Sequence, residues 1–124
     1  MKVRIWPLDK LMSGEISEAQ LVDSIIELAQ TLGYHICHFR PALTAKGYRT
    51  AIQGTVGFPD LVIVGFGKVF AWECKNEKGK LTAEQQEWLR EFLKAGASVG
   101  VIRPHDWLND SVLEQLKAEI KKLE

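Results

Sequence analysis

The sequence has few cysteines, no long apolar run and no excess of charge of either sign. Two cysteines, Cys37 and Cys74, are too few for a disulfide scaffold or a zinc site, and we expect both to be buried as small hydrophobic residues. No apolar run approaches the roughly 18 residues of a membrane-spanning helix. The amino terminus lacks the apolar region of a signal peptide, so we expect a cytoplasmic protein without a membrane segment.

The balance of basic and acidic residues does not exclude a nucleic-acid-binding protein. There are 16 basic and 16 acidic residues, whereas a nucleic-acid-binding domain is often basic. The distribution of charge matters more than its total, so a neutral sum is compatible with nucleic-acid binding. The 124 residues are 46% hydrophobic, which excludes disorder and suits one domain with one core.

Two neighbouring apolar segments, residues 57–64 and 69–75, carry three charges between them. The short link at residues 65–68 favours a hairpin. Side chains alternate along a strand, so Glu73 and Lys75 share one face, and Asp60 enters at the start of the partner strand. Two carboxylates beside one ammonium favour a bound cation, and Mg²⁺ prefers such oxygen ligands. The alternative interpretation is a turn aspartate and a solvated strand edge.

These residues resemble a nuclease signature. Pro59-Asp60, a spacer and Glu73-Cys74-Lys75 are similar to the PD-(D/E)XK motif. A longer string resembles the VRR-NUC branch of that superfamily: Gly57-Phe58-Pro59-Asp60-Leu61, then Glu73-x-Lys75, then Leu81-Thr82-x-x-Gln85-x-x-Trp88-Leu89. The resemblance covers about residues 17–117. It implies a single VRR-NUC-like domain over residues 1–124, of bacterial or phage origin.

The pattern of elements agrees with the fold that this resemblance implies. We expect helices at 17–32, 82–95 and from 110 or 111 to about 123, strands at 34–39 and 98–103, and the hairpin between them. Residues 2–6 alternate like a short strand of no assigned function. A helix between the third and fourth strands demands a crossover, which gives a mixed sheet. The fold class is therefore α/β: a restriction-endonuclease-like αβββαβ core, with helices flanking a central mixed sheet.

The resemblance also implies roles in a metal site. Asp60 and Glu73 would bind Mg²⁺ or Mn²⁺, with the main-chain carbonyl of Cys74 as a further ligand. Glu18, on the first helix, would be a third carboxylate, although an acid in a first turn is also favoured by the helix dipole. Lys75 would orient or help to deprotonate the attacking water and offset phosphate charge.

Gln85 has two interpretations. The resemblance places it in the active site as a catalytic residue. Its spacing from Thr82 is that of a helix capping box. Both can hold, because the box would fix the position of the amide.

Residues 40–57 form a long connection without clear periodicity. Basic residues and an aromatic residue there suit contacts with nucleic acid, although a solvated loop is the alternative. With one residue of a later turn, the candidate nucleic-acid contacts are Arg40, Lys46, Tyr48, Arg49 and Lys78. His35 and His38 point to opposite faces, so they are poor joint metal ligands. Residues 105–107 suit either a packed turn or the rim of the site.

The resemblance implies a metal-dependent, structure-selective DNA endonuclease. It would act as a Holliday-junction-resolvase-like or flap nuclease on branched or flapped DNA in replication, recombination or repair, and as a homodimer. An alternative is a non-catalytic nucleic-acid-binding or scaffold domain on the same fold. A restriction-type enzyme is disfavoured, because 124 residues leave little room for a recognition domain.

Overall fold

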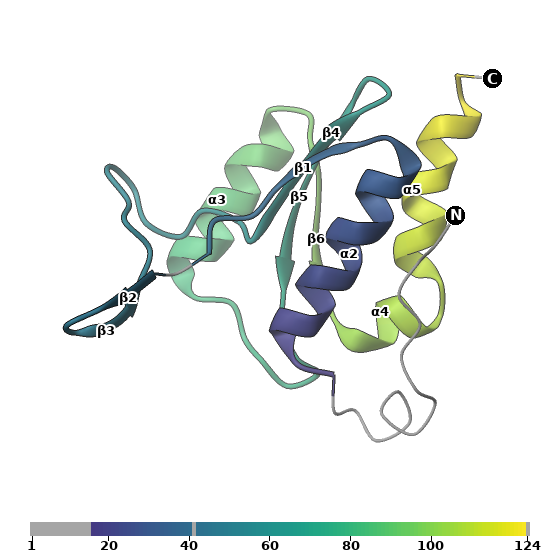
Figure 1. Cartoon of the computed structure of the whole chain (residues 1–124). Helices are drawn as coiled ribbons and strands as arrows, with labels where there is room; N and C mark the ends of the chain where they lie inside the picture. The colour runs from purple at the N-terminus through teal and green to yellow at the C-terminus, as the bar shows by residue number, and fades with distance from the viewer. Residues whose placement is uncertain (1–15, 41, 124) are drawn as a thin grey trace.

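The computed structural model describes residues 16–40 and 42–123, so the strand expected at residues 2–6 lies outside it. Figure 1 shows a sheet between helices, with a small hairpin projecting from one side. In chain order the elements are α2 (Glu18–Leu32), β1 (His35–Cys37), β2 (Ala42–Thr44), β3 (Gly47–Arg49), β4 (Leu61–Gly65), β5 (Lys68–Cys74), α3 (Ala83–Lys94), β6 (Ser98–Ile102), α4 (Pro104–Leu108) and α5 (Ser111–Lys121). Without the β2–β3 hairpin and α4, this is the expected order.

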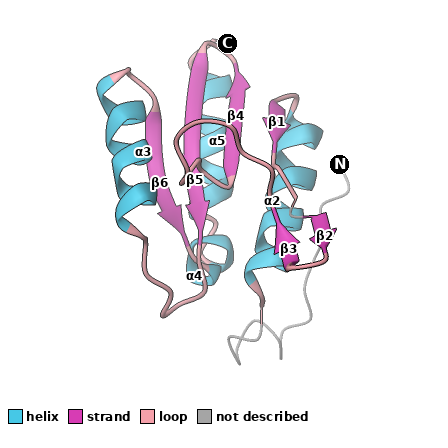
Figure 2. Cartoon of the chain, turned by 90° about the vertical axis from the view of Figure 1, so that its left-hand side faces the viewer, coloured by secondary structure: helices cyan, strands magenta, loops and turns pink. Residues whose placement is uncertain are grey.

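The central sheet is mixed, as predicted. Its strand order is β1-β4-β5-β6; the first two pairings are antiparallel and β5 pairs with β6 in parallel. The parallel pair is joined through α3, the crossover helix. Figures 1 and 2 show three layers, with α3 on one face of the sheet and α2 and α5 on the other. The predicted fold class is confirmed.

Strand alternation divides the β4–β5 hairpin into a core face and a site face. Phe70, Trp72 and Cys74 join the hydrophobic core under α2 and α5. Tyr34 ties the C-terminal helix to this core, because its hydroxyl donates to the main-chain oxygen of Leu116 at 2.6 Å. Glu73 lies on the other face, towards α3, yet it is also fully buried.

The turn between β4 and β5 has the expected hairpin geometry. Its two central residues, Phe66 and Gly67, have φ angles of 52° and 78°, as a two-residue type I′ turn requires. A bulky residue is unusual at positive φ. The ring of Phe66 packs edge-on against Tyr34, with centroids 4.9 Å apart, which compensates for the backbone conformation.

Three expectations from the sequence were wrong in detail. The connection over 40–57 contains the two-stranded β2–β3 hairpin, whose residues are all exposed, so no buried face marked its period. The strand expected over 34–39 extends only over His35–Cys37. Cys37, expected to be buried, is exposed on this strand. Residues 105–107 belong to the short helix α4, begun by Pro104. Within the described part of the chain, no helix is long and apolar enough to cross a membrane.

Candidate functional site

The ends of β4 and β5 bring Asp60 and Glu73 together. The main-chain N–H of Asp60 donates to Oε1 of Glu73 at 2.9 Å, and the main-chain N–H of Cys74 donates to Oδ2 of Asp60 at 2.8 Å. Each carboxylate is therefore held by the backbone of the other strand. This reciprocal clasp fixes both acids at one end of the hairpin, as the strand pattern predicted.

Glu73 is an unusual carboxyl group. Its side chain is fully buried, and its Oε2 atom has no hydrogen-bond partner among the described residues. Burial, followed by the negative charge of Asp60, raises the pKa of Glu73 from 4.5 to about 8, although Lys75 offsets part of this. A buried acid with one oxygen unpartnered is poised to receive either a proton or a cation.

Lys75 and Glu18 lie around this pair from two different elements. Lys75 directly follows β5, and its main-chain N–H donates to Ile102 of β6 at 3.0 Å. Glu18 is the first residue of α2, and its Oε1 accepts from the main-chain N–H of Asn76 at 3.2 Å. The structure therefore joins the first helix to the segment that carries Lys75. This contact occupies the Oε1 atom of Glu18.

The donor set fits a hard cation in part. Mg²⁺ is commonly held by one or two carboxylates with waters and phosphate, which the free Oε2 of Glu73 and the neighbouring Asp60 match. Burial, then Asp60, Glu73 and Glu18, raises the pKa of the Cys74 thiol well above its ordinary value. Its main-chain carbonyl, rather than a thiolate, is the atom suited to a hard cation. Over residues 16–40 and 42–123, no group of three His, Cys, Asp or Glu side chains is close enough to hold a metal ion.

Gln85 forms the capping box that its spacing predicted. Its Oε1 accepts from the main-chain N–H of Thr82 at 3.0 Å, and the Thr82 hydroxyl accepts from the N–H of Gln85 at 3.1 Å. The same arrangement starts α2, where Ser17 and Gln20 form the box. The position of Gln85 is thus fixed by the helix start, and its catalytic role stays a prediction.

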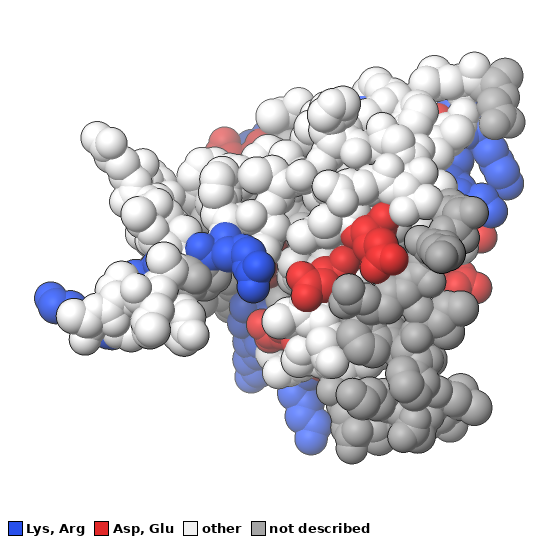
Figure 3. All heavy atoms as spheres, in the orientation of Figure 1, with Lys and Arg blue, Asp and Glu red and all other residues white. Residues whose placement is uncertain are grey.

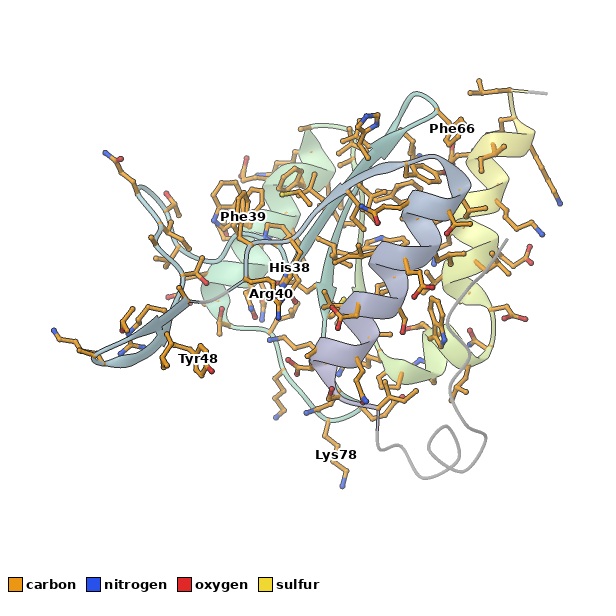
Figure 4. All side chains as sticks on the ribbon, in the orientation of Figure 1. His38, Phe39, Arg40, Tyr48, Phe66 and Lys78 are labelled. Atoms are coloured by element: carbon orange, nitrogen blue, oxygen red, sulfur yellow. The ribbon has the colours of Figure 1, made fainter. Side chains whose placement is uncertain are left out.

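The candidate nucleic-acid contacts do not form one cluster. Lys46 lies in the turn of the projecting hairpin, with Tyr48 and Arg49 on β3. Figure 4 shows Arg40 between β1 and this hairpin, and Lys78 extending away from the body at its lower edge. On the face seen in Figure 3, Lys and Arg side chains run down the middle, beside acidic side chains over α2.

Arg103 and His38 support the site through hydrogen bonds to main-chain oxygens. Arg103 donates to the main-chain oxygens of Asn76 and Gly79, at 2.6 and 2.8 Å, which fastens the turn after Lys75. Nδ1 of His38 donates to the main-chain oxygen of Asp60 at 2.7 Å. This bond fixes the His38 ring beside Asp60. All three bonds join residues more than twenty positions apart, so no local sequence spacing predicts them.

A solved structure described as a VRR_NUC domain is similar to this chain. The two are 23% identical, the match covers 85% of this chain and 96% of that one, and the TM-score is 0.50. No protein-family model and no curated protein matches the sequence. At this identity the likeness shows the fold: the chain folds like a VRR_NUC domain, as the motif resemblance implied.

Proposed function

We propose that this chain is a metal-dependent nuclease that hydrolyses phosphodiester bonds in DNA. The observation that carries the proposal is the clasped pair of Asp60 and Glu73, with a buried, unpartnered Glu73 oxygen and Lys75 near enough to influence that carboxyl group electrostatically. Structural networks also perturb carboxyl groups, but a raised pKa at a strand end that also carries a lysine favours a reactive site. The VRR_NUC-like fold supports this interpretation.

In this proposal Asp60 and Glu73 hold Mg²⁺ or Mn²⁺, with the carbonyl of Cys74, and Glu18 binds directly or through water. A cation held there would supply polarisation of the phosphate and a lowered pKa of its bound water. Lys75 orients the attacking water and offsets the charge that develops on the phosphate. Gln85, whose side-chain oxygen is held in the capping box, helps to hold Lys75 or the water.

The proposed substrate is branched or flapped DNA, and the active form is a homodimer in which two sites cut two strands. The cross-strand neighbours Val64 and Val69 are both exposed and supply apolar surface that a second copy would cover. Residues 1–124 would act as one nuclease domain with its core at about 17–117. Light scattering tests the dimer; a strict monomer at micromolar concentration contradicts it.

One observation favours a non-catalytic binding domain instead. In the described part of the chain the carboxylate pair lacks a third close acidic, histidine or cysteine ligand. A nuclease would then depend on main-chain, water and phosphate oxygens to complete the coordination of the metal.

A cleavage panel separates the two functions. Labelled four-way junction, flap, duplex and single strand are incubated with Mg²⁺, Mn²⁺ or EDTA, with Lys75→Ala and a control, Lys94→Ala, whose lysine lies exposed at the end of α3. Metal-dependent cutting that is lost only in Lys75→Ala establishes the nuclease. Tight binding without cutting establishes the binding domain.

A further inference from the structure

A cavity of about 630 Å³ opens beside the candidate active site. Its wall includes three aromatic rings, those of Phe39, Phe58 and Trp88, and also the side of Asp60. The residues that follow β3, from Thr50 to Gln53, close it on the hairpin side. Figure 2 shows the loop between β3 and β4 passing in front of the sheet, on the side that α2 and α5 leave uncovered. A volume of this size lies in the ordinary range for small-ligand sites.

The aromatic wall is a continuous set of edge-to-face contacts. Phe58 lies at its centre, with its ring centroid 6.1 Å from that of Phe39 and 5.2 Å from that of Trp88. Phe39 is 61% exposed, although it belongs to this cluster. Figure 4 shows Phe39 on the segment between β1 and the hairpin, where its ring faces the α3 side of the molecule. The cluster thus leaves the ring of Phe39 mostly exposed on the wall of the cavity.

The loop that closes the cavity is fixed to α3. Nε1 of Trp88 donates to the main-chain oxygens of Thr55 and Val56, at 3.2 and 3.0 Å. Gly57 then passes so close to α3 that a Cβ there would lie 2.7 Å from the main-chain carbon of Glu84. The cavity is therefore formed before any ligand binds, which lowers the entropic cost of binding.

The cavity and the carboxylate pair share Asp60. Its side chain lines the cavity, its Oδ2 accepts from Cys74, and its main-chain oxygen accepts from His38, which also lines the cavity. A group inside the cavity would therefore lie next to a phosphate held at Asp60 and Glu73. Threonine and glutamine side chains at Thr50, Gln53 and Thr55 add hydrogen-bonding groups to the apolar wall.

We propose that this cavity takes an unpaired nucleobase of the DNA strand, stacked on Phe39, next to the phosphate that is cut. The inference rests on the proposed nuclease function. It adds a structural reason for that nuclease to select unpaired DNA. A base inside a duplex is paired and stacked, so it must be unpaired or extruded before it can enter such a cavity. Aromatic rings stack any base, so the cavity selects unpaired DNA without selecting sequence.

The first experiment measures base stacking without cleavage. A single strand and a flap containing 2-aminopurine at the unpaired position are titrated with protein in EDTA, and fluorescence quenching is recorded. Wild type and Phe39→Trp quench the probe, whereas Phe39→Ala binds about 5- to 100-fold more weakly, the loss expected for one base–aromatic stack. The matched control is Leu93→Ala, which removes an apolar side chain of similar exposure, 58%, and quenches as wild type does. A probe in a fully paired duplex stays unquenched.

The second experiment measures selectivity during cleavage. With Mg²⁺ or Mn²⁺, wild type cuts the flap faster than the duplex, and this ratio falls about 5- to 100-fold in Phe39→Ala but is retained in Phe39→Trp and Leu93→Ala. Circular dichroism and Tm confirm that each variant is folded; Phe39 is mostly exposed, so its truncation spares the core.

The two proposals fail in different ways. If wild type cleaves DNA but leaves the probe unquenched, or if Phe39→Ala keeps the full flap-to-duplex ratio, the nucleobase cavity is wrong and the nuclease stands. If quenching depends on Phe39 but no substrate is cut with any metal, the cavity stands and the nuclease is wrong. An unquenched probe overturns the cavity whatever the cleavage result.

Discussion

Asp60 and Glu73 are bound to each other's strands through main-chain N–H groups. The Asp60 N–H donates to Glu73, and the N–H of Cys74, the residue after Glu73, donates to Asp60. Hydrogen bonds to ionised acceptors are stronger than those between neutral groups. Holding two acids this close creates mutual repulsion, which a cation between them would relieve.

Replacement of Glu73 by Gln separates the metal site from the fold. Glu73→Gln keeps the shape of the side chain and an oxygen acceptor for the Asp60 N–H, but removes the negative charge. We expect cleavage to fall about 1,000-fold or more, because several kcal/mol of metal-derived stabilisation are lost. Single-turnover cleavage in Mg²⁺ measures this, with a Tm to confirm folding. Activity within threefold of wild type would refute the assignment.

The stability of the metal-free protein should fall as the pH rises from about 4.5 to about 8. The pKa of Glu73 is near 8 in the folded chain against 4.5 ordinarily, so the folded state keeps a proton that the unfolded state releases. Folding is thus favoured by protonated Glu73 at low pH, and this contribution is lost as the pH approaches 8. Urea unfolding in EDTA at pH 5 and pH 8 measures the loss.

Two controls accompany this pH series. In Glu73→Gln the difference between pH 5 and pH 8 shrinks, because the titrating group is gone. Added Mg²⁺ stabilises wild type more at pH 8 than at pH 5, because the cation displaces a proton. Equal pH dependence in wild type and Glu73→Gln would show that Glu73 titrates normally.

The projecting hairpin should contribute charge to DNA binding. Lys46→Ala and Arg49→Ala should each lower the slope of log K against log salt concentration by about 1, with similar effects on all sequences. Lys122, at the end of α5 and on the opposite side of the molecule, supplies the control Lys122→Ala. Fluorescence anisotropy at four salt concentrations gives the slopes. A hairpin that is merely solvated predicts unchanged slopes for all three variants.

Gly57 and Gly54 form a matched pair for testing the loop wall. Both have left-handed φ angles, 101° at Gly57 and 108° at Gly54. A Cβ at Gly57 would lie 2.7 Å from the backbone of Glu84, whereas no described atom lies within 4 Å of a Cβ at Gly54. Gly54→Ala should cost about 1 kcal/mol, the penalty for the left-handed conformation. Gly57→Ala should cost more than about 2 kcal/mol, because the clash is added to this strain. Equal costs in urea denaturation would mean that the loop can leave α3 freely.

The contact between Glu77 and His105 should be visible by titration. Nδ1 of His105 lies 2.7 Å from Oε2 of Glu77, and this hydrogen bond raises the pKa of His105. Slight burial alone would raise the pKa of Glu77, but its hydrogen bonds with His105 lower it. The Glu77–His105 pair therefore stabilises the fold at pH values between the pKa of Glu77 and that of His105. This stabilisation is lost as the pH rises past the pKa of His105. In an NMR titration, the midpoint of His105 should drop in Glu77→Gln; an unchanged midpoint would exclude the contact.

The sequence predicted the two strands of the candidate site well, because their pattern is local. Alternation across residues 69–75 places Glu73 and Lys75 on one face, and apolar flanks indicate that this face is not a solvated edge. Capping boxes at Ser17 and Thr82 fix the starts of two helices through contacts three residues apart. These elements obey rules that a few neighbouring residues determine.

The remaining features depend on contacts between distant segments. The sequence pattern places Trp88 on an apolar helix face. In the structure its indole N–H is hydrogen-bonded to a loop more than thirty positions away. The sequence pattern places Phe39 in a strand. In the structure it follows the end of β1 and belongs to an aromatic cluster. The hairpin at residues 42–49 buries no face, so its sequence lacks the alternation that marks a strand.

The hairpin also has a consequence for engineering. It leaves the sheet after β1 and returns before β4, two strands that pair directly with each other, so it is an excursion from an otherwise complete αβββαβ scaffold. A change in its length or sequence should therefore leave the register that aligns β4 with β5 unaltered. Grafting other hairpins at this point should yield a series of proteins that share the Asp60–Glu73 site and differ in the surface beside it.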